Sequence, residues 1–151
     1  MSRAFIKEDI DPPERKRRPR AASGLPPGAT NYITTRGAQR LRKELSALRR
    51  AAPPDEARIA ELEKMLASVT VVEPEADPAT IAFGARVTVR DEAGEERAYR
   101  IVGIDELDFY PDAVSWISRN GKTLLAAEPG DRVALENETR GKVVAVDYPA
   151  G

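Results

Sequence analysis

The side chains of this chain that could take part in chemistry are mostly carboxylates. Asp105, Glu106 and Asp108 fall within four consecutive positions, and Asp55 and Glu56 form a second acidic pair. The chain contains no cysteine and no histidine. Cysteine nucleophiles, disulfides, thiolate zinc sites and histidine general bases are therefore excluded. Any catalysis would depend on carboxylate, lysine, tyrosine or serine groups, or on a metal ion held by oxygen atoms.

The first acidic segment follows two runs with the alternating pattern of β-strands. Val87 and Val89 alternate with polar neighbours, and after a turn a second alternating run covers residues 98–102. Alternation of this kind is typical of strands with one buried and one solvated face. Gly103 interrupts the second run, so we expect residues 104–108 to form an acidic loop at the end of a strand.

The second acidic pair lies between two helical patterns. Apolar residues recur at spacings of 3, 4 and 3 over residues 38–48 and again over 59–69, as in amphipathic helices. Thr34 or Thr35 can cap the first helix, two prolines end it, and Asp55 can cap the second. About 15 residues per helix, at a rise of 1.5 Å per residue, give a length of roughly 22 Å. We therefore expect a short antiparallel helical hairpin of the coiled-coil type.

The rest of the chain continues the strand pattern. We expect a strand over 113–118, a short helix or turn over 119–127, and a final hairpin with strands at 132–136 and 142–148. Together with the earlier runs, these elements predict a small antiparallel β-sheet crossed by one short helix. The predicted fold class is therefore α+β, a helical hairpin followed by a sheet domain.

Composition and pattern divide the chain into four parts. We expect a flexible basic tail over 1–30, the helical hairpin over 31–72, a linker over 73–80 and the sheet domain over 81–149. The chain has a net charge of −1, yet the tail holds seven basic and four acidic side chains. Its prolines and scarce aliphatic residues indicate a segment that cannot bury enough surface to fold.

A compact basic cluster lies within this tail. Its members are Arg15, Lys16, Arg17, Arg18 and Arg20. Such a cluster serves either as a solvated, solubilising tail or as a contact to nucleic-acid phosphates, where closely spaced cations displace counterions. Because no aromatic residue is interleaved for base stacking, contact with DNA or RNA would be non-specific.

Several segments of the sequence resemble one known family. The runs FGARVTV, RIVGIDELD, AVSWIS, GDRV and VVAVDY are similar to the C-terminal domain of the GreA/GreB family of transcript-cleavage factors. The start MSRAFIKEDI, with LPPGATNYIT and RGAQRLRKEL, resembles the GreB branch. The resemblance implies an FKBP-like fold for the sheet domain and bacterial RNA polymerase as the partner.

The resemblance also implies how the protein would act. In that family the C-terminal domain docks on the rim of the polymerase secondary channel, and the helical arm enters the channel. Acidic residues at the arm tip help to position a Mg²⁺ ion that activates water for cleavage of backtracked RNA. Carried over to this chain, the resemblance places Asp105, Glu106, Asp108 and Ser118 at the polymerase rim. The alternative is a solvated acidic loop.

Two features depart from the family pattern. The arm is much shorter, and its tip acids Asp55 and Glu56 are adjacent, so on a helix they face different directions. A helix N-cap for Asp55 and a favourable first-turn charge for Glu56 are structural alternatives to metal positioning. After Ser118, Arg119 stands where the family usually has a proline.

We therefore predict a cytoplasmic, monomeric regulator that docks on RNA polymerase without stimulating transcript cleavage. It is expected to be no enzyme itself and to hold no cofactor or metal, and no apolar run approaches the roughly 20 residues of a membrane span. One alternative is an active cleavage factor that uses Asp55 and Glu56 to position Mg²⁺. Two others are a peptidyl-prolyl isomerase, suggested by the FKBP-like resemblance, and a nucleic-acid chaperone acting through the tail.

Overall fold

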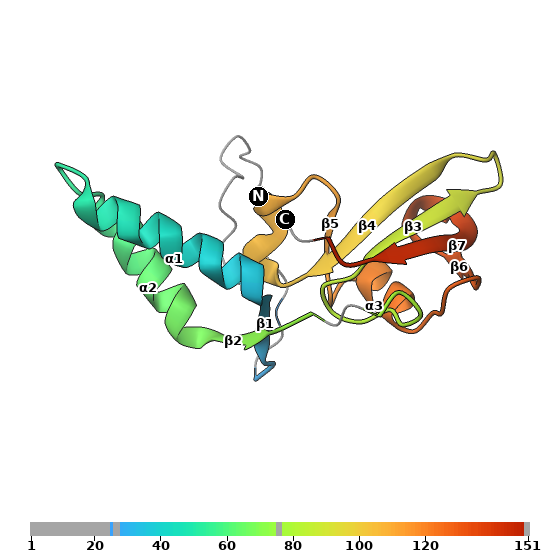
Figure 1. The fold of residues 1–151 in the computed structure, drawn as a ribbon, viewed down its shortest axis with the longest axis horizontal. Coiled ribbons are helices and arrows are strands. Elements are labelled where there is room, and N and C mark those ends of the chain that lie inside the picture. Colours follow the sequence, from blue (N-terminus) through green and yellow to red (C-terminus); the bar gives the residue numbers. More distant parts are fainter. Residues whose placement is uncertain (1–24, 26–27, 75–76, 150–151) are drawn as a thin grey trace, which may run out of the picture.

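The computed structural model describes residues 25, 28–74 and 77–149, and it is α+β, with a helical part and a curled sheet (Figure 1). A five-stranded sheet has the order β5-β4-β3-β7-β6, and a separate two-stranded sheet joins β1 and β2. The elements in chain order are β1 (Asn31–Thr34), α1 (Thr35–Arg50), α2 (Glu56–Ser68), β2 (Val69–Val72), β3 (Arg86–Asp91), β4 (Glu96–Val102), η2 (Ile104–Phe109), β5 (Ala113–Ser115), α3 (Arg119–Leu125), β6 (Arg132–Ala134), η3 (Glu136–Glu138) and β7 (Arg140–Asp147).

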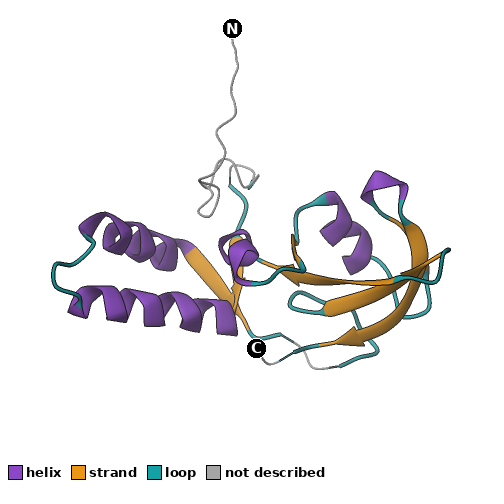
Figure 2. Ribbon diagram, turned by 90° about the horizontal axis from the view of Figure 1, so that it is seen from above, coloured by secondary structure: helices purple, strands orange, loops and turns teal. Residues whose placement is uncertain are grey.

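The helices α1 and α2 lie side by side and run in opposite directions (Figure 2). Thr34 caps α1, its side chain accepting a hydrogen bond from the backbone N–H of Gly37 at 3.0 Å. Asp55 caps α2 in the same way, accepting from the N–H of Arg58 at 3.1 Å. Both caps agree with the sequence pattern, and Leu41 of α1 packs with Leu62 of α2 in one apolar cluster. Among the described residues, no helix is both long and apolar enough to cross a membrane.

The two short strands that flank the helices were not foreseen. β1 and β2 pair in parallel, with Asn31 opposite Val69 and Thr34 opposite Val72. Val69, placed by its spacing in the second helix, instead begins β2. Parallel neighbours need a crossover connection, and the two helices supply it, because α1 leads the chain away and α2 leads it back.

The main sheet is mixed, so the prediction of an antiparallel sheet is wrong for one pair of strands. β3 pairs antiparallel with β4 and β7, and β6 pairs antiparallel with β7. β5, however, runs parallel to β4. The reason is the connection between these two strands, where η2 and the residues after it carry the chain back before β5 begins. β5 is also shorter than predicted and ends at Ser115.

The predicted alternation is confirmed on β3, where Val87 and Val89 are buried in the sheet core with Leu124 of α3. On β4 the pattern changes, because Arg100 and Val102 are buried as well as Ile101. Ile101 faces the sheet core, whereas Arg100 stacks over the ring of Tyr110 on the other face, 3.9 Å from its centroid. The end of β4 is therefore covered on both faces.

The turn between β6 and β7 contains two non-glycine residues in the left-handed region, Asn137 at φ 62° and Glu138 at φ 58°. Such a conformation is strained for glutamate. We expect Glu138→Gly to raise the free energy of unfolding by about 1 kcal/mol, measured by urea denaturation. Glu136→Gly, at an exposed position outside that region, is the control and should lower the stability. An unchanged or lower stability for Glu138→Gly would contradict the expectation.

Candidate functional site

The predicted acidic loop is the 3₁₀-helix η2, and its central acid lies inside the protein. The Glu106 side chain is 0% exposed. Its Oε2 accepts hydrogen bonds from the backbone N–H groups of Thr34 and Gly103, each at 2.9 Å, and its Oε1 accepts one from the Thr34 hydroxyl. This corrects the prediction of a direct polymerase contact by Glu106, because a side chain without exposed surface cannot touch a docked partner.

Two glycines allow the close packing around this carboxyl. A Cβ atom on Gly37 would lie 2.2 Å from Glu106 Oε1, and a Cβ on Gly103 would lie 1.9 Å from the carbonyl oxygen of Tyr32. Both distances are far below van der Waals contact, so neither position has room for a side chain. Thr34 and Gly37 were not predicted from the sequence as parts of this site. The glycine in the first turn of a predicted helix was the available signal, because glycine weakens a helix unless close packing requires it.

Burial raises the pKa of the Glu106 carboxyl. The hydrogen bonds from Thr34 and Gly103 favour the charged form and partly offset this effect, whereas the negative charge of Asp105 adds to it. The carboxyl therefore keeps its proton to a higher pH than an exposed glutamate does.

The other two acids of η2 stay at the surface. Asp108 is exposed, and Asp105 is half-buried and accepts a hydrogen bond from the Asn31 amide at 2.9 Å. Next to them, Phe109 packs against the helical cluster, and the Arg40 guanidinium lies 4.4 Å from the centroid of its ring. η2 thus presents acidic side chains outward while its other side holds β1 and α1.

Ser118, the fourth predicted contact, is the N-cap of α3. Its hydroxyl donates to the carbonyl of Ser115 at 2.6 Å and accepts from the N–H of Gly121 at 3.0 Å. Trp116 lies nearby with its indole edge-on to Tyr32, ring centroids 5.1 Å apart. The Ser118 side chain therefore has a structural role, and only its half-exposed surface is available to a partner.

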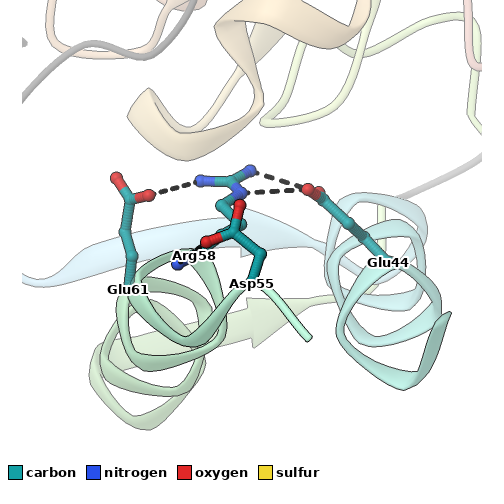
Figure 3. A network of polar contacts seen from close by, with 4 residues as sticks. All are labelled: Glu44, Asp55, Arg58 and Glu61. Carbon is teal, nitrogen blue, oxygen red and sulfur yellow. Dashed lines mark hydrogen bonds and ion pairs between the residues drawn. The ribbon is translucent and has the colours of Figure 1, made fainter. Parts of the chain in front are cut away.

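At the far end of the helices, the carboxylates of Glu44, Asp55 and Glu61 are held by neighbouring groups (Figure 3). Arg58, whose side chain is 13% exposed, forms ion pairs with Glu44 of α1 at 2.9 Å and with Glu61 of α2 at 2.8 Å. Burial lowers the pKa of Arg58, but the hydrogen bonds and charges of these two glutamates outweigh it and raise the pKa. Asp55 points toward the same region while it caps α2.

The other predicted site residues are either exposed or lie outside the described residues. Glu56 lies exposed in the first turn of α2. The five basic residues Arg15, Lys16, Arg17, Arg18 and Arg20 lie outside the described residues. In the part of the chain that the structure describes, no group of three or more acidic side chains is arranged to hold a metal ion.

Comparisons with known proteins agree on one family. Residues 75–148 match the family model described as transcription elongation factor, GreA/GreB, C-terminal. GreB of Neisseria meningitidis serogroup B is 38% identical over 96 residues, covering 60% of this chain and 59% of that protein. GreA of Alkalilimnicola ehrlichii is 31% identical over 152 residues, covering 77% of this chain and 96% of that protein. A solved GreA/GreB structure from Nitrosomonas europaea is 28% identical with a TM-score of 0.44, covering 79% of this chain and 100% of that chain.

The chain therefore belongs to the GreA/GreB family of transcription elongation factors. The family model covers the sheet part, and the A. ehrlichii match extends over nearly the whole of that relative. The chain spans about 59% of the length of the Neisseria GreB relatives that it matches.

The raised pKa of Glu106 makes the stability of this site dependent on pH. The pKa of Glu106 is higher in the folded protein than in the unfolded chain, where it is about 4.3. The protonated carboxyl therefore contributes its full stabilisation at a pH below the unfolded pKa. This contribution to the free energy of unfolding is lost as the pH rises through the pKa of the folded protein. Glutamine has no such proton. We therefore expect the free energy of unfolding of the wild type, minus that of Glu106→Gln, to fall as the pH rises, in urea titrations from about pH 4 to about pH 8.

The matched control is Glu92→Gln, a substitution of an exposed carboxyl in the β3–β4 turn. It should keep the pH dependence of the wild type. A wild-type minus Glu106→Gln difference that stays constant over the whole pH range would contradict the expected linkage.

Proposed function

We propose that this protein docks on RNA polymerase at the secondary channel and regulates elongation without stimulating transcript cleavage. The observation that carries the proposal is the state of the arm's carboxylates. Asp55 caps α2, and Glu44 and Glu61 are paired with Arg58. Carboxylates held in this way are not directed toward a metal ion outside the arm. Glu56, the other tip acid, lies exposed in the first turn of α2, and catalysis tolerates little misplacement of such groups.

The length of the arm (α1 and α2, residues 35–68) supports the same proposal. At 1.5 Å per residue, the 16 residues of α1 extend about 24 Å and the 13 residues of α2 about 20 Å. The A. ehrlichii GreA has more residues in the aligned region, since 152 positions cover 96% of it but only 77% of this chain. An arm that is shorter than the family arm holds its tip farther from the polymerase active site.

The surface proposed for docking lies on the sheet part, which we take to be the family's FKBP-like domain. Asp105 and Asp108 on η2, with the half-exposed surface of Ser118, would contact the polymerase rim. Asp108 is exposed and Asp105 has exposed surface beside it, so a basic partner surface can reach both. Exposed acids of this kind raise the rate and selectivity of association more than they raise affinity alone. In this proposal the protein acts on the polymerase and is not itself an enzyme.

Charge reversal at Asp108 tests the docking surface. We expect Asp108→Lys to weaken binding to core RNA polymerase roughly tenfold at low salt, with a smaller loss at high salt, because exposed charges are screened. Biolayer interferometry with immobilised polymerase measures both. Glu92→Lys makes the same charge change at an exposed position in the β3–β4 turn and should bind as the wild type does. Equal losses for both variants, or no binding by the wild type, would overturn the proposal.

A backtracked elongation complex supplied with Mg²⁺ tests the absence of cleavage. We expect the wild-type protein to leave the rate of RNA shortening at its factor-free level, because no carboxylate of the arm reaches the metal. The alternative is an active cleavage factor. In that case RNA shortens faster with the wild type, and the Asp55→Asn/Glu56→Gln double variant loses the effect. Asparagine is as good an N-cap as aspartate, so this variant keeps the helix and removes only the charges.

A further inference from the structure

We propose that Glu106 is the positioning residue that fixes the direction of the arm relative to η2. The docking role of the acidic segment rests on the proposed function. Glu106 gives the same segment a second, structural role. Glu106 belongs to η2, yet two of its three hydrogen bonds come from Thr34, 72 positions earlier in the chain. Thr34 is the N-cap of α1.

The Thr34 side chain links the carboxyl directly to the helix. Its hydroxyl donates to Glu106 Oε1 and its oxygen accepts from the N–H of Gly37 in the first turn of α1. The third bond, from the N–H of Gly103, ties the carboxyl to the end of β4. One buried group therefore connects the main sheet, η2 and the start of the arm, and hydrogen bonds are directional, so they fix angle as well as distance.

Among the described residues, Tyr32 of β1 also joins the arm to the sheet part, because its ring packs on those of Phe83 and Trp116. The apolar cluster of the sheet and that of the helices have no residue in common. A cavity of about 400 Å³ separates the first turn of α1 from β4, lined by Thr35 and Arg36 on one side and Arg100 on the other. The polar links from Asn31 to Asp105 and from Arg40 to Phe109 also end on η2. The polar contacts of Thr34, Asn31 and Arg40 thus meet on this one short element, whereas the aromatic contacts of Tyr32 with Phe83 and Trp116 lie outside it.

A partner would therefore bind the exposed side of η2, while the buried side of the same element holds the arm. Asp105 and Asp108 flank Glu106 in the sequence, and their positions change if Glu106 leaves its pocket. Docking and arm direction are coupled through this residue, and the coupling acts in both directions.

Distance measurements on the free protein test the proposal. The chain has no cysteine, so Ala51→Cys at the arm tip and Ala93→Cys in the β3–β4 turn can each carry a spin label at an exposed site. Double electron–electron resonance should give a narrow distance distribution in this background and with Glu106→Gln, which can still accept the two backbone N–H bonds. With Glu106→Ala we expect the distribution to broaden or shift. An unchanged distribution in a folded Glu106→Ala protein overturns the proposal.

Gly37→Ala is the second variant, for the case that Glu106→Ala does not fold. Its Cβ would displace Glu106 Oε1, although alanine favours the helix more than glycine does, so a broadened distribution cannot come from melting of α1. Ser46→Ala, at an exposed position of the same helix, is the control and should leave the distribution unchanged. If Gly37→Ala leaves it unchanged as well, the proposal fails.

Polymerase binding separates this inference from the proposed function. If the wild type does not bind polymerase, the docking proposal fails, but the distances in the free protein still decide the role of Glu106. If the wild type binds and Glu106→Ala binds with the same affinity and the same effect on elongation, the coupling between docking and arm direction fails, whatever the distances show.

Discussion

The rest of the structure depends on a carboxyl group that has no contact with water. A buried carboxyl is unfavourable unless donors surround it, and here the donors are the N–H and hydroxyl of Thr34 and the N–H of Gly103. Meeting this requirement brings β1, the first turn of α1 and the end of β4 to one point. Gly37 is needed because a side chain there would collide with the Glu106 carboxyl, and Gly103 because a side chain there would collide with the backbone carbonyl of Tyr32.

A hydrogen-bonded contact between the arm and the sheet part suits a protein that has two small hydrophobic cores. The helical cluster and the sheet cluster are separate, and apolar contact alone would let one part slide over the other, since it has little directional preference. Hydrogen bonds to a single carboxyl set one orientation. They also make this contact sensitive to substitution, because removal of the Glu106 carboxyl would leave three buried donors without a partner.

The acidic side chains of this chain are divided between two kinds of environment. In the arm Asp55 caps a helix, and Glu44 and Glu61 pair with Arg58, whereas on η2 one acid is buried and two remain at the surface. Acidic residues therefore stabilise the arm at one end of the molecule, and at η2 they are available to a partner. This division favours recognition over metal chemistry as the use of the exposed acids.

The sequence by itself determined the features that depend on near neighbours. The caps at Thr34 and Asp55, the end of α1 before the prolines and the buried face of β3 follow from local spacing. The family was also recognisable from short motifs. Only the tertiary structure decided that β1 pairs with β2, that β5 runs parallel to β4 and that Glu106, among three similar acids, is the buried one. Those outcomes depend on contacts such as that between Thr34 and Glu106, which local patterns do not encode because the partners are 72 positions apart.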